Sequence, residues 1–230
     1  QVSPVGVQAL EEVRVDFSPF DVRRGGFTGA SIAAVSRSGS NTRTWSAFAQ
    51  GAGGWARGPN PDDGRHDLRG YFDGRAGFNV GGAVVPSKAF YFLSAEVAEQ
   101  RLPIERRFGA PTTGGSVYSF PAGAATQFVS TLTRRGYDPG RMDIVTLGQK
   151  MMTVFGRIDL ALTPQHHFSV RVNSLLTRGD TPPPGTTVFA SGALARTWEV
   201  THSIALEVNS VWNSRVSNEL LAGYTSRRFP

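Results

Sequence analysis

The chain has 230 residues, of which 18% are charged and 40% hydrophobic, and its formal net charge is +6. It has no cysteine, which excludes a disulfide scaffold, a thiolate metal site and a cysteine nucleophile. No apolar run approaches the roughly 18–20 residues of a membrane-spanning helix, so a helical membrane protein is excluded as well. Low charge, 27 glycines and 15 phenylalanines favour a β-rich protein whose outer surface need not face water.

The positive charge comes mostly from arginine, since the only lysines are Lys88 and Lys150. The arginines are scattered in ones and twos with no cluster of five, so we expect no nucleic-acid partner. The chain begins at Gln1, without an initiating methionine or an apolar leader. We therefore expect a mature or excised piece of a longer product.

The first forty residues are expected to form a compact unit punctuated by glycine. Alternation at Val13, Val15 and Phe17 predicts a short strand, and the small residues of 30–35 predict a second. Between them lies a segment rich in turn residues that includes Gly25 and Gly26.

Seven segments downstream predict strands with two different faces, because apolar and polar residues alternate along them. They span 45–50, 76–85, 89–98, 154–162, 168–173, 200–212 and 219–226. Most are about as long as a tilted transmembrane β-strand, which needs roughly 9–11 residues. The segment 122–135 predicts a helix, since Phe128, Val129 and Leu132 have helical spacing and Gly136 follows as a stop.

Short turns alternate with long polar connections along this series. The turns occupy 86–88, 163–167 and 213–218, and the long connections occupy 51–75, 99–152 and 177–197. Loops of that length are uncommon in a soluble sandwich and have no reason to alternate with turns. An outer-membrane barrel has short periplasmic turns and long extracellular loops.

In such a barrel the apolar parity of each strand faces lipid and the polar parity faces the lumen. An arginine on the lipid face near the midplane costs roughly 2–4 kcal/mol, so the strand arginines should point inward. The candidate residues of a transport path are therefore the charged and amide side chains on the polar parity. These are Arg157, Asp159, Arg171, Asn173 and Glu207.

Several short motifs, in order along the chain, resemble one known family. The first set is Glu11-Glu12-Val13-Arg14-Val15, Ser18-Pro19-Phe20-Asp21, Arg24-Gly25-Gly26-Phe27-Thr28-Gly29 and Val35-Ser36-Arg37-Ser38-Gly39-Ser40-Asn41. The second set is Asn79 to Val85 with Lys88 to Phe92, Arg157-Ile158-Asp159 with Leu162-Thr163, and Asn218-Glu219-Leu220 with Gly223-Tyr224. Together they resemble TonB-dependent outer-membrane receptors of the Oar-like branch, whose members usually also have a carboxypeptidase-regulatory-like domain.

This resemblance implies an all-β fold, with the end of a plug domain in 1–41 and the first part of a transmembrane antiparallel β-barrel in 42–230. About seven of roughly 22 strands would be present. The plug-like motif would include Gly25, Gly26, Thr28, Gly29, Arg37, Ser38, Gly39 and Asn41. The implied location is the outer membrane of a Gram-negative bacterium.

The implied function is energised passage of a bulky substrate, by uptake or export. The implied partners are outer-membrane lipid, an extracellular substrate whose identity the family does not fix, and the TonB complex. The TonB complex would be contacted through a segment absent from this chain. No cofactor is implied.

Motifs for catalysis and metal binding are absent or incomplete, so we expect no enzyme, no cofactor and no metal site. Neither a Gly-x-Ser-x-Gly elbow nor a His-Glu-x-x-His pair occurs, which disfavours a hydrolase. The glycines of 51–54 lack the context of a phosphate-binding loop. His166 and His167 are adjacent strand residues, so they should point to opposite faces. The acidic segment 60–67 lacks the ligand spacing of a calcium loop, although calcium there stays open.

Five aromatic residues fall near predicted strand ends: Trp45, Tyr91, Trp198, Trp212 and Tyr224. Aromatic girdles at the two membrane interfaces would explain them, and so would core packing in a soluble sheet. His202 lies on an apolar parity, where an interfacial or packed histidine is expected. The alternative function is thus a soluble or secreted all-β module that binds glycans or surfaces.

Overall fold

A computed structural model describes residues 6–17, 30–56, 70–105, 107–108, 117–118, 123–185 and 188–229. Two parts of the sequence predictions lie outside these residues. They are the acidic segment 60–67 and the glycine-rich part of the plug-like motif, with Gly25, Gly26, Thr28 and Gly29.

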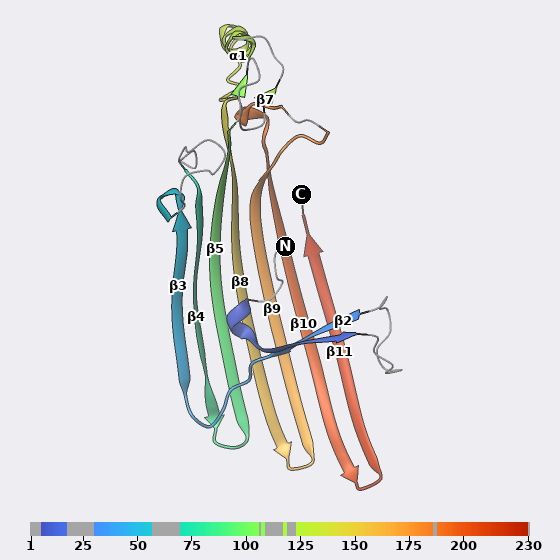
Figure 1. The fold of residues 1–230 in the computed structure, drawn as a ribbon. Helices are drawn as coiled ribbons and strands as arrows, with labels where there is room; N and C mark the ends of the chain where they lie inside the picture. The colour runs from blue at the N-terminus through green and yellow to red at the C-terminus, as the bar shows by residue number, and fades with distance from the viewer. Residues whose placement is uncertain are drawn as a thin grey trace.

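The described chain is built around one antiparallel sheet of seven strands (Figure 1). Its strands are β3 (Thr44–Gly53), β4 (Phe72–Val85), β5 (Ala89–Glu105), β8 (Ile144–Thr163), β9 (His166–Thr181), β10 (Ala195–Asn213) and β11 (Val216–Arg228). They are hydrogen-bonded in chain order, so the sheet is an up-and-down meander with β3 and β11 at its edges. This confirms the all-β class and the seven predicted strands.

Short turns join the strands at one end of the sheet, at 86–88, 164–165 and 214–215. The long connections lie at the opposite end, and the one between β5 and β8 contains the two-residue parallel pair β6 (Arg107–Phe108) and β7 (Val117–Tyr118). Further one-turn 3-10 segments are η2 (Gly54–Ala56) and η3 (Ser191–Ala193). We call these two ends the turn end and the loop end of the sheet.

The strands extend further toward the loop end than the alternation of residues predicts. The pairing of β5 with β8 continues through Glu99 opposite Lys150 to Glu105 opposite Ile144. Backbone hydrogen bonds do not require an apolar face, whereas the prediction relied on one. The long connections therefore begin later and end earlier than the predicted bounds 51–75, 99–152 and 177–197.

The predicted helix is present as α1 (Ala124–Arg134) within the connection between β5 and β8. Its C-terminal end is a Schellman motif, in which Tyr137 N–H donates to Leu132 O at 3.0 Å and Gly136 N–H donates to Thr133 O at 3.0 Å. Gly136 has φ of 85°, which explains why the helix stops at this glycine. Within the described residues no helix is both long enough and apolar enough to span a membrane.

The N-terminal residues form a separate hairpin of β1 (Leu10–Phe17) and β2 (Ala30–Ser36), preceded by the 3-10 turn η1 (Val7–Ala9). The hairpin crosses one face of the large sheet, at a steep angle to its strands (Figure 1). Ala9 is fully buried there, against Phe92 of β5 and Phe155 of β8, whose rings are 6.2 Å apart. This small cluster is the apolar core beneath the hairpin.

Candidate functional site

Residues paired across neighbouring strands form rows that run across the sheet, and we call each row a rung. Successive rungs lie on opposite faces of the sheet, and the two faces differ in polarity. One rung consists of Ser46, Asn79, Ser94, Phe155, Asn173, Ser203 and Thr225. The neighbouring rung, on the opposite face, consists of Trp45, Val80, Leu93, Gly156, Val172, Ile204 and Tyr224. We call these the polar face and the apolar face, because successive side chains of a strand alternate between faces.

Burial on these faces is the inverse of a soluble sheet. On the polar face Thr153 and Asn79 are 1% and 4% exposed, whereas Ile158 and Leu93 on the apolar face are each 52% exposed. The hairpin and its linker to β3 cover part of the polar face, and no described element covers the apolar face. Water normally drives apolar side chains inward, so an exposed apolar face of this extent is unusual for a sheet in water.

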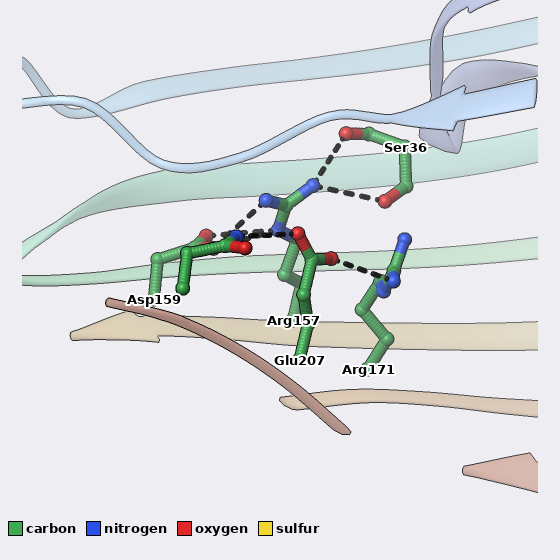
Figure 2. A network of polar contacts seen from close by, with 6 residues as sticks. Ser36, Arg157, Asp159, Arg171 and Glu207 are labelled. Atoms are coloured by element: carbon green, nitrogen blue, oxygen red, sulfur yellow. Dashed lines mark hydrogen bonds and ion pairs between the residues drawn. The ribbon is translucent and has the colours of Figure 1, made fainter. Parts of the chain in front are cut away.

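Arg157 of β8 forms hydrogen bonds that join the sheet to the hairpin. Its Nη1 donates to the carbonyl oxygen of Ser36 at 2.8 Å and to Ser36 Oγ at 3.0 Å (Figure 2). Its Nε and Nη2 bind the carboxylate of Asp159 at 2.8–2.9 Å. Asp159 is two residues further along β8, on the same face, so it holds the guanidinium in place to reach Ser36.

Arg171 lies directly opposite Arg157 across the pairing of β8 with β9. Two like charges in this position repel each other unless each has a counter-ion. Arg171 Nη2 binds Glu207 Oε2 at 2.9 Å, and Glu207 Oε1 accepts a second hydrogen bond, from Asn209 Nδ2 at 2.8 Å. Each arginine therefore has its own carboxylate, and the four charges sum to zero.

The predicted transport-path residues all lie on the polar face. Arg157, Asp159, Arg171 and Glu207 form one cluster on three adjacent strands (Figure 2). Asn173 follows Arg171 along the same face of β9 and is buried opposite Phe155 and Ser203. A cavity of about 400 Å³ adjoins the cluster and is bordered on its other side by Ser38 and Gly39.

The described residues of the plug-like motif form the linker from the hairpin to β3. Arg37 fixes its start, because Arg37 N–H donates to Ala9 O at 2.8 Å and Arg37 Nε donates to Leu10 O at 3.1 Å. Ser38 follows at the edge of the cavity beside Arg157. Asn41 fixes its end, since Asn41 Oδ1 accepts a hydrogen bond from Ser87 N–H at 2.7 Å in the β4–β5 turn.

Gly39 makes the closest approach of the linker to the sheet. A Cβ on this residue would lie 2.6 Å from Gly82 O and 2.9 Å from Tyr91 N, and closer still to Tyr91 O. Real Cβ atoms do not approach backbone so closely, so no larger residue fits here without moving the linker. This close approach explains the glycine, and it brings the linker onto the backbone of β4 and β5.

Sequence reasoning missed Glu96 as part of the polar face. Its side chain is 2% exposed, and Arg75 Nη1 lies 3.7 Å from Glu96 Oε1. Its Oε2 lacks a hydrogen bond within the described part of the chain, and Gly6 packs directly against it. Parity in 89–98 places Glu96 with Phe92 and Ser94, but sequence alone does not reveal that η1 lies over it.

The histidines and aromatics take varied positions. His167 borders the polar-face cavity, whereas the ring of His166 packs edge-on against Trp212, with ring centroids 5.1 Å apart. His202 Nδ1 and Ser174 Oγ are hydrogen-bonded at 2.9 Å on the apolar face. No group of three potential metal ligands occurs among the described residues.

Four of the predicted girdle residues do lie near strand ends. Trp45, Tyr91 and Trp212 are close to the turn end of β3, β5 and β10, and Trp198 is close to the loop end. Tyr224 instead lies in the middle part of β11, opposite Ile204, so its predicted position near a strand end is wrong.

Comparisons with known proteins identify no relative. No family model, no curated protein and no solved structure matches the chain.

Proposed function

We propose that the chain is part of a TonB-dependent outer-membrane transporter of the Oar-like branch. Residues 1–41 form the end of its plug, and residues 42–230 form the first strands of its barrel wall. The transporter moves a bulky substrate across the outer membrane with energy supplied through the TonB complex. The proposal includes no catalytic step and no cofactor.

The observation that carries the proposal is the uncovered apolar face. Along β8 its side chains include Met152, Val154, Ile158 and Leu160, over a distance of about 26 Å at roughly 3.3 Å per residue. This length compares with the apolar band of roughly 25 Å on outer-membrane barrels, before allowing for strand tilt. Lipid is the neighbour that would favour such a face, whereas water would penalise it.

The sheet edges support a wall that continues beyond seven strands. β3 and β11 each have one described strand as a neighbour. In lipid every backbone N–H and C=O needs a protein partner, because an unsatisfied group costs several kcal/mol. A closed barrel supplies those partners to both edges, and further strands of the same transporter are the natural source.

In the proposed transport step, the hairpin detaches from the polar face of the sheet. The plug-like hairpin is attached to the wall by the charge-assisted hydrogen bonds of Arg157 and by the packing of Ala9. Such a contact is small compared with the continuous strand pairing of the wall. Force from the TonB complex therefore detaches the hairpin while the wall stays intact, and the Arg157–Glu207 cluster then lines the opened path.

Fractionation of a Gram-negative host that expresses the complete transporter containing this chain tests the proposal. We expect the protein in the outer membrane, with heat-modifiable mobility on gels as a sign of a closed barrel. Recovery as a water-soluble monomer would contradict the proposal and would favour the secreted binding module instead. A variant with Ile158→Arg is the matched probe, because it should lower the outer-membrane yield while Arg157→Leu should not block insertion.

A further inference from the structure

The charged residues on the apolar face are confined to its loop end. By strand register they are Glu99, Arg101, Glu105, Lys150, Arg178, Asp180, Arg196 and Arg228. Toward the turn end, the described strands have no charged residue on this face, down to the rung of Leu160, Phe168, Val208 and Leu220. Five cations and three carboxylates give the loop-end patch a net charge of +2.

The cations directly border the apolar band. Lys150, Arg178 and Trp198 form one rung, and Met152, Leu176 and Val200 form the next rung on the same face. A groove of about 910 Å³ is lined by the first rung and by Leu176 and Val200 of the second, and it reaches Arg196 at its outer end. A ligand in this groove would meet guanidinium and ammonium groups at one end and aliphatic side chains at the other.

Three of these cations, Arg178, Arg196 and Arg228, have no counter-ion among the residues that the structure describes. Glu99 is already shared by Arg101 at 2.7 Å and Lys150 at 3.7 Å. Asp180 Oδ2 accepts a hydrogen bond from Gly148 N–H at 2.9 Å. The guanidinium groups of Arg178 and Arg196 make no hydrogen bond or ion pair with any described residue, and both side chains are exposed.

The surface beside Lys150 is also hollowed. A second groove of about 580 Å³ adjoins the first, and small residues such as Ala49, Gly74 and Ala76 line it together with Val97 and Met152. Small side chains between larger aliphatic ones leave room for an extended hydrocarbon chain against the sheet. The cations could therefore bind the headgroup of a lipid molecule whose acyl chains lie in the adjoining grooves.

We propose that the loop end of the apolar face binds the phosphate-bearing headgroup of an anionic lipid, whose acyl chains lie in the two grooves. Arg178 and Arg196 bind the phosphate oxygens, and Met152, Leu176 and Val200 contact the chains. Arginine suits this role because its planar donor groups match phosphate geometry. The site is formed on one leaflet only, the leaflet at the loop end. This inference depends on the proposed membrane location and adds the class of lipid to it.

Quenching of Trp198 by brominated lipids tests the inference. The probe is the complete transporter that contains this chain, reconstituted in phosphatidylcholine vesicles, with every tryptophan except Trp198 replaced by phenylalanine. Within this chain the changes are Trp45→Phe, Trp55→Phe and Trp212→Phe. A small fraction of brominated phosphatidylglycerol is compared with the same fraction of brominated phosphatidylcholine. Each cation near a membrane surface favours anionic lipid by about 1 kcal/mol, so two cations predict a preference of about thirtyfold.

Two double variants distinguish lipid binding at the proposed site from a general effect of the protein's net charge on lipid preference. The double change Arg178→Gln and Arg196→Gln should bring the preference close to one. The matched double change Lys88→Gln and Arg215→Gln removes the same charge at the turn end and should leave the preference unchanged. Inorganic phosphate in excess over the lipid should not reverse the preference, because the acyl chains contribute to binding.

The outcomes distinguish the two proposals. Equal quenching by the two lipids overturns the anionic-lipid site, while the quenching itself supports the membrane location. Loss of the preference in the turn-end control, or its reversal by inorganic phosphate, also overturns the site. No quenching by either lipid overturns both the site and the membrane location.

Discussion

Arg157 and Ile158 are neighbours in β8, and their surroundings are opposite. The Arg157 side chain is 18% exposed and bound to both a carboxylate and the hairpin, while Ile158 is 52% exposed with no element over it. In a soluble sheet the isoleucine would be buried and the arginine solvated. The comparison shows that the polar face packs against the hairpin, whereas the apolar face is left exposed, and the proposed function assigns lipid to that exposed face.

We expect the largest loss of folding stability when an arginine is placed on the apolar face, compared with an arginine on the polar face. Ile204 and Ser203 are adjacent in β10, and they lie on the apolar and polar faces respectively. In lipid, Ile204→Arg should destabilise the folded protein by about 2–4 kcal/mol, whereas Ser203→Arg should cost well under half as much. Denaturant titration of each variant refolded into bilayers measures the difference. Equal costs would show that the two faces do not have different neighbours.

The next effect concerns the hairpin. Arg157→Ala removes the donors to Ser36 and leaves the partly buried Asp159 without its counter-ion. We expect the hairpin to open more easily by about 2 kcal/mol, seen as faster hydrogen exchange of the amides in β1 and β2. Arg171→Ala is the control, because Arg171 binds Glu207 and makes no hydrogen bond or ion pair with the described residues of the hairpin. If both variants release the hairpin equally, Arg157 is not its anchor.

A smaller effect is expected at the linker. Gly39→Ala would push a methyl group into the backbone of Gly82 and Tyr91, so the linker must move at a cost of about 1–3 kcal/mol. Gly51→Ala is the matched control, since a Cβ there would lie no closer than 3.7 Å to any atom. Thermal unfolding compares the two. A Gly39→Ala midpoint no lower than that of Gly51→Ala would contradict the observed close approach.

The smallest change in stability is expected at the exposed pair of Arg141 and Asp143, which lies outside the sheet. Arg141 donates hydrogen bonds to Asp143 just before β8, and this holds the pKa of the Asp143 carboxyl below its usual range. The pair therefore stabilises the fold above the ordinary carboxyl pKa, and this stabilisation is lost as pH falls through the lowered folded value. In Arg141→Gln, the fall in stability between pH 5 and pH 2 should be slightly smaller. Because both side chains are exposed, a large difference would contradict this account.

Sequence alternation predicted the strands and their faces well, because burial on a single side imposes a period of two. Arg157, Asp159 and Glu207 were placed on one face by parity alone. Their convergence depends on register, which sets Arg171 opposite Arg157 and was beyond the reach of a pattern within one strand. The anchor at Ser36 joins residues 121 positions apart, and no local signal indicates such a contact.

The ends of the strands were predicted least well, for a related reason. At the loop end both faces contain polar residues, as at Lys150 and Gln149 in β8, so the alternation fades although the pairing continues. The same loss of pattern concealed the one-sided distribution of charge on the apolar face. That distribution becomes visible only when the rungs of neighbouring strands are read together.

The most direct test of the proposed function is whether the apolar face of the sheet lies in lipid. Since the chain has no cysteine, single cysteines can be placed at each position from Met152 to Asp159 without background. A lipid-soluble quencher and a water-soluble thiol reagent then report the surroundings of each position in vesicles. The account predicts that lipid accessibility alternates, high at 152, 154, 156 and 158 and low at 153, 155, 157 and 159. Uniform access of the water-soluble reagent to both sets would contradict it.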